Sequence, residues 1–240
     1  MPIKYAVPPY RYAAPLKRSL TDSGIEVLTA LPPDAHALIS NGIITAGLVP
    51  IFMLIDGKLQ PAPGPMVYSE AETMSVLVVS RNPVPLRECG SIAASPESRS
   101  AVAYLGIVMD RAGIKSRIIT GFSANAGLLL SVYRCALVLG DEALKARTSF
   151  HVVADVGELV RDVLGINPVY AATGARDASI DLSHIRPIPI DEDAAETSRI
   201  TGISLDEAKR YHESIKLGYD EAKLSTALRT LAELLNESPK

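Results

Sequence analysis

The sequence has few cysteines, and their placement argues against two kinds of stabilising site. Cys89 and Cys135 are the only two among 240 residues. They lie far apart without CxxC spacing, and no histidine stands close to either. Disulfide scaffolds need more cysteines, and structural zinc sites need cysteine and histidine at short spacing. We therefore expect neither a disulfide framework nor a zinc site.

Long apolar runs are also missing. The most apolar stretch, residues 42–55 (GIITAGLVPIFMLI), is too short to span a bilayer and contains Pro50. The first ten residues, MPIKYAVPPY, hold one lysine and no sustained apolar region, unlike a secretory signal. These features predict a soluble, cytoplasmic protein with no membrane partner.

The charge balance gives no reason to expect nucleic acid as a partner. Lysine and arginine number 24 and aspartate and glutamate 27, for a formal net charge of -3. The basic residues are scattered rather than gathered in an arm or tail. A hydrophobic fraction of 48% in a chain of this length is enough to bury one large core or two modest ones.

Short apolar strands alternate with helical patterns along the chain, which predicts an α/β fold. Strands are expected at residues 3–7, 25–28, 43–46, 73–80, 91–94, 116–120, 135–139, 151–154 and 168–173. Helices are expected near residues 10–19, 33–40, 98–112, 124–132, 141–145 and 156–164, and again from 191 onward. Residues 61–65 (PAPGP) have the composition of a loop.

The pattern also predicts two lobes. Residues 81–167 hold enough alternating units to form a lobe of their own, and apolar strands at 74–79 and 169–173 flank them. If both strands cross between lobes, residues 1–80 and 168–240, with the C-terminal helices, form the other lobe. Such a two-lobed design binds its ligand in the cleft, where hinge closure can bury it.

Serines stand where the helix near residue 98 begins. Ser98, Arg99 and Ser100 would place hydroxyls beside the unpaired N–H groups of a helix N-terminus, which suits a carboxylate or phosphate. The plainer interpretation is that Ser95 or Ser98 is an N-cap, with Pro96 at the first helical position. The pattern alone favours the cap.

Other candidates have similar alternatives. Met74 and Ser75 lie in an apolar strand, where the hydroxyl either bonds a neighbouring carbonyl or lines the cleft. Asp141 follows Gly140 and the strand CALVL. It either contacts a ligand at the carboxyl end of this strand or caps the next helix. Arg11 follows the first strand, either gripping a carboxylate or lying on the surface. No glycine-rich phosphate loop, catalytic triad order or metal-ligand spacing is present.

Six segments occur in an order and spacing that resemble a known enzyme family. They are residues 12–16 (YAAPL), 42–51 (GIITAGLVPI), 74–76 (MSV), 98–102 (SRSAV), 139–144 (LGDEAL), and 155–165 followed by 169–171. In this order the chain is similar to the futalosine-pathway menaquinone enzymes, and most similar to the chorismate dehydratase branch. That branch has Asn-x-x-Pro-Leu at the first segment, an active-site serine at the third and Ser-Arg-Thr-Ser-Val at the fourth.

The resemblance implies a type II periplasmic-binding-protein fold with two crossing hinge strands, and removal of water from chorismate without a cofactor. It implies Ser75 as the catalytic residue. It implies substrate contacts at Arg11, Tyr12, Thr45, Met74, Ser98, Arg99, Ser100, Gly140, Asp141 and Tyr170. The partner is then a small carboxylate, and the chain acts as a monomer or dimer.

The chain also departs from the family pattern. Tyr12 stands at the asparagine position, and Ile43 or Thr45 at the position of an aspartate. Pro96 and Glu97 replace small hydroxylated residues before the helix. Gly140 and Asp141 stand where the sister branch, which forms a dihydroxynaphthoate, has its catalytic histidine. An intracellular carboxylate-binding protein of the same fold is therefore the alternative to the dehydratase.

Overall fold

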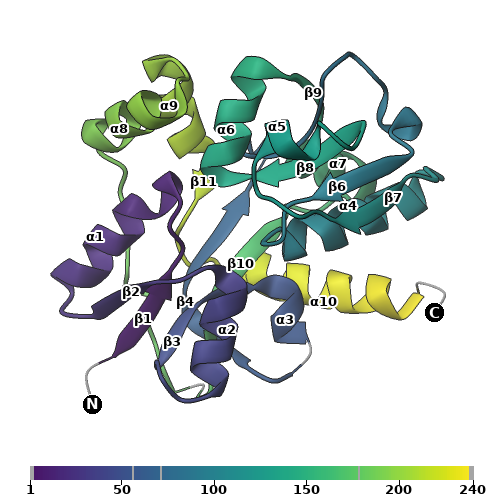
Figure 1. The fold of residues 1–240 in the computed structure, drawn as a ribbon. Helices are drawn as coiled ribbons and strands as arrows, with labels where there is room; N and C mark the ends of the chain where they lie inside the picture. Colours follow the sequence, from purple (N-terminus) through teal and green to yellow (C-terminus); the bar gives the residue numbers. More distant parts are fainter. Residues whose placement is uncertain (1–2, 56, 71, 178, 238–240) are drawn as a thin grey trace. The chain divides into compact units, whose positions relative to one another are not determined.

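The computed structural model describes residues 3–55, 57–70, 72–177 and 179–237 and divides the chain into two compact units. The first unit comprises Met1–Tyr68, Pro168–Ile190 and Lys216–Lys240, and the second comprises Ser69–Asn167 and Asp191–Ile215. Each unit holds its own β-sheet with flanking helices (Figure 1). The predicted α/β class with two separate sheets is confirmed.

The first unit is built on a sheet with strand order β11-β4-β10-β3-β1-β2. Its strands are β1 (Lys4–Val7), β2 (Glu26–Thr29), β3 (Ala46–Pro50), β4 (Gln60–Ser69), β10 (Val169–Ala175) and β11 (Ile215–Lys216). Its helices are η1 (Arg11–Ala13), α1 (Ala14–Asp22), α2 (Pro32–Ser40), α3 (Ile51–Ile55) and α10 (Glu221–Glu237). β1 pairs in parallel with β2 and β3, whereas β10 runs antiparallel to β3 and β4.

A buried hydroxyl pair joins the middle of this sheet. The Tyr5 hydroxyl is hydrogen-bonded to Thr173 Oγ1 at 2.7 Å, and Thr173 Oγ1 donates to the Pro65 carbonyl at 2.7 Å. Burial raises the pKa of the Tyr5 phenol, so the group stays neutral. The segment PAPGP, which we expected to be a loop, lies inside β4. Because β11 covers so little of its outer edge, β4 tolerates prolines that cannot donate.

The second unit is built on a sheet with strand order β7-β6-β8-β5-β9. Its strands are β5 (Val76–Ser80), β6 (Ser91–Ala94), β7 (Arg117–Thr120), β8 (Cys135–Leu139) and β9 (His151–Asp155). Its helices are η2 (Leu86–Glu88), α4 (Arg99–Arg111), α5 (Ala126–Leu129), α6 (Gly140–Ser149), α7 (Val156–Leu164), α8 (Asp191–Thr201) and α9 (Leu205–Ser214). β6 is parallel to β7 and β8, and β5 is antiparallel to β8 and β9.

The boundaries of the two units differ from those expected. β5 was assigned to the first lobe, but it pairs with β8 and β9 along its whole length. Helices α8 and α9 were also expected in the first lobe and belong to the second unit, where α8 packs against α6. An amphipathic pattern says that a helix buries one face, but not which sheet or helix covers that face.

The cysteines also differ from expectation. Cys89 and Cys135 form a disulfide with a Cα–Cα distance of 5.6 Å, although we expected no disulfide. The absence of CxxC spacing was misleading, because the disulfide joins residues 46 positions apart in the sequence. Ser91 opens β6 and Cys135 opens β8, and these parallel neighbours bring the two cysteines to the same end of the sheet. In the residues that the structure describes, no helix has both the length and the apolar character needed to cross a membrane.

Candidate functional site

Three strand ends bring candidate residues to one edge of the second sheet. Ser95 follows β6 and Gly140 follows β8, which are parallel, and Ser75 precedes β5, which is antiparallel to β8. The Ser95 amide donates to the Leu137 carbonyl at 2.9 Å, and the Gly140 amide donates to the Ser75 carbonyl at 2.8 Å. This edge holds the carboxyl ends of β6 and β8, where α/β sheets commonly bind ligands.

The start of helix α4 is not capped in the way that the sequence favoured. Ser98 occupies the N-cap position, but its side chain accepts no hydrogen bond from the helix. Its hydroxyl is instead hydrogen-bonded to the Ser95 hydroxyl. In the described part of the chain, the amides of Arg99 and Ala101 have no acceptor. The helix therefore presents free donors, with Ser100 buried in the first turn and Arg99 exposed.

Gly140 and Asp141 open helix α6. Gly140 adopts a φ of 63°, a backbone conformation that glycine tolerates without strain. The N-cap of α6 is Leu139, so Asp141 lies in the first helical turn and is not the cap. A carboxylate in the first turn stabilises the helix, because it interacts favourably with the positive end of the helix dipole. The capping interpretation of Asp141 is wrong, and its side chain remains half-buried at the same edge as Ser75.

The segment before β5 contains an unusual backbone conformation. Met74 has a φ of 58° and is the one non-glycine residue with positive φ in the described ranges. Its amide donates to Asp155 Oδ2 at 2.8 Å. Asp155 is buried, and this burial raises the pKa of its carboxyl, although hydrogen bonds from Thr73 oppose the shift. Sequence reasoning assigned Asp155 no role at the site, because the contact joins residues 81 positions apart.

The first unit brings three further candidates to one edge of its own sheet. Arg11 and Tyr12 lie in η1, directly after the carboxyl end of β1, and the Tyr12 ring stands 5.7 Å from the Tyr10 ring between centroids. Tyr170 lies at the start of β10, where Ala171 pairs with Pro50 at the carboxyl end of β3. Because β1 and β3 are parallel, all three side chains belong to the same edge.

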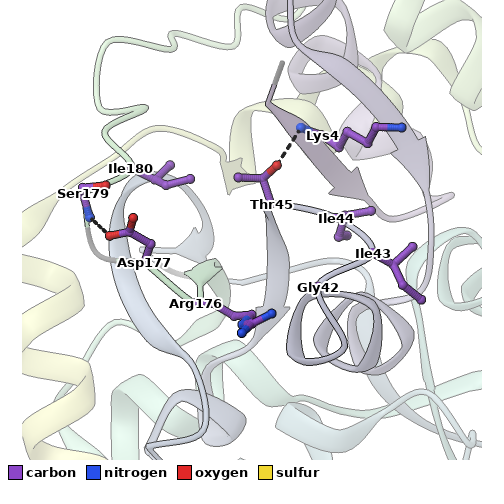
Figure 2. Close-up of a pocket in the computed structure, with 9 residues that line it drawn as sticks. All are labelled: Lys4, Gly42, Ile43, Ile44, Thr45, Arg176, Asp177, Ser179 and Ile180. Atoms are coloured by element: carbon purple, nitrogen blue, oxygen red, sulfur yellow. Dashed lines mark hydrogen bonds between the residues drawn. The ribbon is translucent and has the colours of Figure 1, made fainter. Parts of the chain in front are cut away.

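Thr45 lies at the opposite edge of that sheet, away from Arg11 and Tyr12. We expected a strand over residues 43–46, but β3 begins at Ala46 and Thr45 immediately precedes it. Thr45 Oγ1 accepts from the Lys4 amide at 3.1 Å, at the amino end of β1 (Figure 2). The prediction of the strand was shifted because residues 42–51 are nearly all apolar, and a bend over Ile43, Ile44 and Thr45 follows the turn after α2.

A cavity of about 600 Å³ opens beside Thr45. Figure 2 shows the residues that line it, with the Lys4 ammonium extending away from Thr45; that ammonium pairs with Glu26 at 3.1 Å. Asp177 Oδ1 accepts from the Ser179 amide at 2.8 Å, so this carboxylate is held within its own loop. All the lining residues belong to the first unit and lie where β1 and β3 begin and the antiparallel β10 ends. Within the first unit, the cavity therefore lies at the opposite edge of the sheet from Arg11 and Tyr12.

The histidines and carboxylates form no metal centre in the parts of the chain that the structure describes, since no three of them gather in a suitable group. His212 in α9 is buried, and its Nε2 atom is hydrogen-bonded to Thr197 Oγ1 of α8 at 2.9 Å. Burial lowers the pKa of the His212 imidazole, against the opposing charge of Asp193. These contacts join α8 to α9, so His212 serves packing within the second unit.

Two sequence comparisons bear on the family. A family model described as menaquinone biosynthesis matches residues 3–235, which covers both units. Among curated proteins, no sequence relative matches the chain.

Comparison with solved structures bears on the fold. A protein from Archaeoglobus fulgidus superimposes with a TM-score of 0.65 at 13% identity, covering 98% of this chain and 96% of that one. The periplasmic aliphatic sulphonate-binding protein of Escherichia coli superimposes with a TM-score of 0.65 at 12% identity, covering 98% of this chain and 86% of that one. The alkanesulfonate-binding protein of Xanthomonas axonopodis, bound to MOPS, has a TM-score of 0.66 at 11% identity, covering 98% of this chain and 92% of that one. The expected periplasmic-binding-protein fold is confirmed.

Proposed function

The chain belongs to the menaquinone biosynthesis family, and on this premise we propose that it is a chorismate dehydratase-like enzyme of the futalosine pathway. The proposed reaction converts chorismate to an enolpyruvyl-oxybenzoate. The ring loses a proton, the electrons of the broken C–H bond form the new ring double bond, and the hydroxyl departs to give water. Aromatisation makes the reaction downhill, so the enzyme needs to supply orientation and a base rather than a redox cofactor.

The observation that carries the proposal is the set of donors at one edge of the second sheet. The free amides of Arg99 and Ala101 and the neighbouring serine hydroxyls suit one carboxylate of chorismate. Ser75, at the same edge, is placed to orient the leaving hydroxyl or the second carboxylate. In this proposal the enolpyruvyl carboxylate of the substrate takes the ring proton, and proximity within the site supplies most of the rate.

Anion binding also fits the structural neighbours. Two of them are described as sulfonate-binding proteins, and a sulfonate, like a carboxylate, is an anion with several acceptor oxygens. In the first unit, Arg11 is proposed to bind a carboxylate, because its guanidinium can grip one with two parallel hydrogen bonds. Tyr12 and Tyr170, at the same edge of the first sheet as Arg11, are proposed to line the ligand that Arg11 binds. A biosynthetic enzyme works where its substrate is made, so we place the activity in the cytoplasm.

Tyr12 favours a second candidate, an intracellular protein that binds a small carboxylate without turning it over. A phenol cannot reproduce the paired donor and acceptor of an amide, and it fills more space than the family asparagine. Incubation of the chain with chorismate, followed by chromatography for the enolpyruvyl-oxybenzoate, tests the two candidates. Product formed by the parent supports the enzyme.

The Tyr12→Asn variant makes this test sharper. If the parent is inactive and Tyr12→Asn forms product, the chain is a diverged relative that binds without catalysis. If neither forms product and the parent binds another carboxylate tightly, the dehydratase proposal is wrong. Formation of product should persist in a chelator, because every step is assigned to the chain and the substrate.

The anion site at α4 gives a separate prediction. Ser98→Ala combined with Ser100→Ala should weaken binding of isophthalate, an unreactive aromatic dicarboxylate, by about tenfold or more, since a hydrogen bond to a charged group contributes about 1.5–3 kcal/mol. Calorimetric titration measures the change. The expected loss is mainly in affinity, because the Ser98 side chain does not cap the helix.

Ser204→Ala is the matched control for this pair. Ser204 caps α9, accepting from the Glu207 amide at 3.2 Å in a capping box. Its replacement should lower the free energy of unfolding by about 1 kcal/mol and leave isophthalate affinity unchanged. If the α4 double variant behaves like Ser204→Ala, its serines are structural only.

A further inference from the structure

The carboxylate of Asp155 holds the two residues that precede Ser75. It accepts from the Thr73 amide at 3.0 Å and from the Met74 amide at 2.8 Å. The Thr73 hydroxyl donates to the same carboxylate at 3.0 Å. These donors belong to the segment entering β5, whereas Asp155 ends β9, the neighbouring strand. The carboxylate therefore bridges the backbone of one strand entry and the end of the adjacent strand.

Met74 needs such a partner because its backbone conformation is unfavourable. A φ of 58° brings the Cβ atom of an L-residue close to its own backbone, which is why the left-handed region is usually occupied by glycine. Strained conformations persist only where their surroundings fix them, and they concentrate at functional sites. The Met74 side chain is buried and its amide is held by Asp155. The strain is thus maintained one residue before the proposed catalytic serine.

The backbone on the other side of Ser75 is fixed as well. Thr73 Oγ1 accepts from the Val76 amide at 3.0 Å, and the Ser75 carbonyl accepts from the Gly140 amide. By contrast, no described residue is hydrogen-bonded to the Ser75 hydroxyl. A residue with a fixed backbone and an uncommitted hydroxyl can present that hydroxyl to a ligand in one direction. Asp155 supplies part of this frame without itself being placed against the ligand.

We propose that Asp155 is a positioning residue that fixes the direction of the Ser75 hydroxyl by holding Met74 in its left-handed conformation. The inference rests on the proposed function, since the hydroxyl has to be aimed at a reacting substrate. Asp155 has a second task, because it caps α7 by accepting from the Gly157 amide at 2.8 Å and the Glu158 amide at 3.4 Å. A test must separate the clamp on Met74 from the helix cap.

Asp155→Ser makes this separation. Serine is a good N-cap, so α7 keeps its start, but a single short hydroxyl cannot also reach the amides of Thr73 and Met74. With chorismate as substrate, kcat should fall by about 10- to 100-fold, because misplacing a reacting group by an ångström costs that much. KM should change by less than about threefold, since the α4 donors are untouched.

Adding Met74→Gly to Asp155→Ser provides a rescue that a helix cap would not show. Glycine adopts a positive φ without a clamp, so the double variant should recover at least part of the lost kcat. Thr73→Ala is a second route to the clamp, since it removes the donating hydroxyl and leaves the α7 cap intact. Asn125→Ser, at the cap of α5 in the same unit, exchanges one cap for another and should leave kcat unchanged.

Hydrogen exchange gives a readout that does not depend on turnover. The Met74 amide should exchange about tenfold faster or more in Asp155→Ser than in the parent, whereas the α7 amides should keep their protection. Unchanged kcat in Asp155→Ser, or a loss that Met74→Gly does not relieve, would overturn the positioning role. An inactive parent overturns the proposed function instead. In that case the exchange rate of the Met74 amide still tests whether Asp155 holds Met74. An unchanged rate in Asp155→Ser would show that it does not.

Discussion

Ser75→Ala is expected to lower kcat for chorismate by about 10- to 150-fold, the equivalent of losing one hydrogen bond to a charged group. The hydroxyl is uncommitted within the described chain, and the backbone around it is fixed from both sides. An interaction strengthened mainly in the transition state affects kcat more than affinity. Steady-state kinetics of product formation, with isophthalate affinity measured separately, will show how the loss is divided.

Ser80→Ala is the matched control for this prediction. Ser80 lies at the other end of β5, is buried like Ser75, and its hydroxyl donates to the Asn82 carbonyl at 2.6 Å. The same substitution there should lower stability and leave kcat unchanged. Equal losses of kcat in the two variants would show that Ser75 acts through the stability of β5. Equal loss of isophthalate binding and kcat would make it a binding residue only.

The edge of the second sheet was predictable because local patterns determine it. The apolar strands ending at Ala94 and Leu139, and the strand beginning at Val76, were expected within a few residues of their observed bounds. Once these strands pair as neighbours, Ser75, Ser95 and Gly140 must share an edge. Strand ends therefore located the candidate residues, although no single pattern identified their chemistry.

Roles that depend on contacts distant in sequence were not predictable. Ser98 and Asp155 both stand at helix starts, and the same local pattern serves a cap, a ligand donor or a clamp. Asp155 does cap its helix, and its second contact lies across a sheet register. Ser98 does not cap its helix, and its hydroxyl bonds that of Ser95 instead. Only the arrangement in space distinguishes these cases.

Boundaries inside uniformly apolar segments were also uncertain from the sequence. Residues 42–51 hold one polar side chain, that of Thr45, so alternation could not fix the start of a strand, and the expected strand was placed before β3. Thr45, which the family resemblance placed among the substrate contacts, therefore precedes β3 instead of lying inside a strand.

Loss of the Cys89–Cys135 disulfide is expected to lower the free energy of unfolding by roughly 4 kcal/mol, the chain-entropy value for a loop of this length. The bridge spans 46 positions and joins the entries of β6 and β8. Its removal lets the unfolded chain explore more conformations, which favours unfolding. Cys89→Ala with Cys135→Ala avoids placing a hydroxyl at the fully buried Cys135 position. Urea unfolding of the parent, with and without reductant, and of this double variant measures the difference.

The double variant should resist reductant, whereas the parent in reductant should approach the stability of the double variant. Because both cysteines lie at the end of the sheet away from Ser95 and Gly140, kcat for chorismate should stay unchanged in all these proteins. Disulfides are rare in the cytosol of mesophiles but occur inside cells of hyperthermophiles. Thiol titration of protein taken from its native cells thus tests the proposed cytoplasmic location. Free thiols would mean that the disulfide does not form in those cells and does not stabilise the protein there. A closed disulfide would require an oxidising compartment, or a cytosol like that of a hyperthermophile.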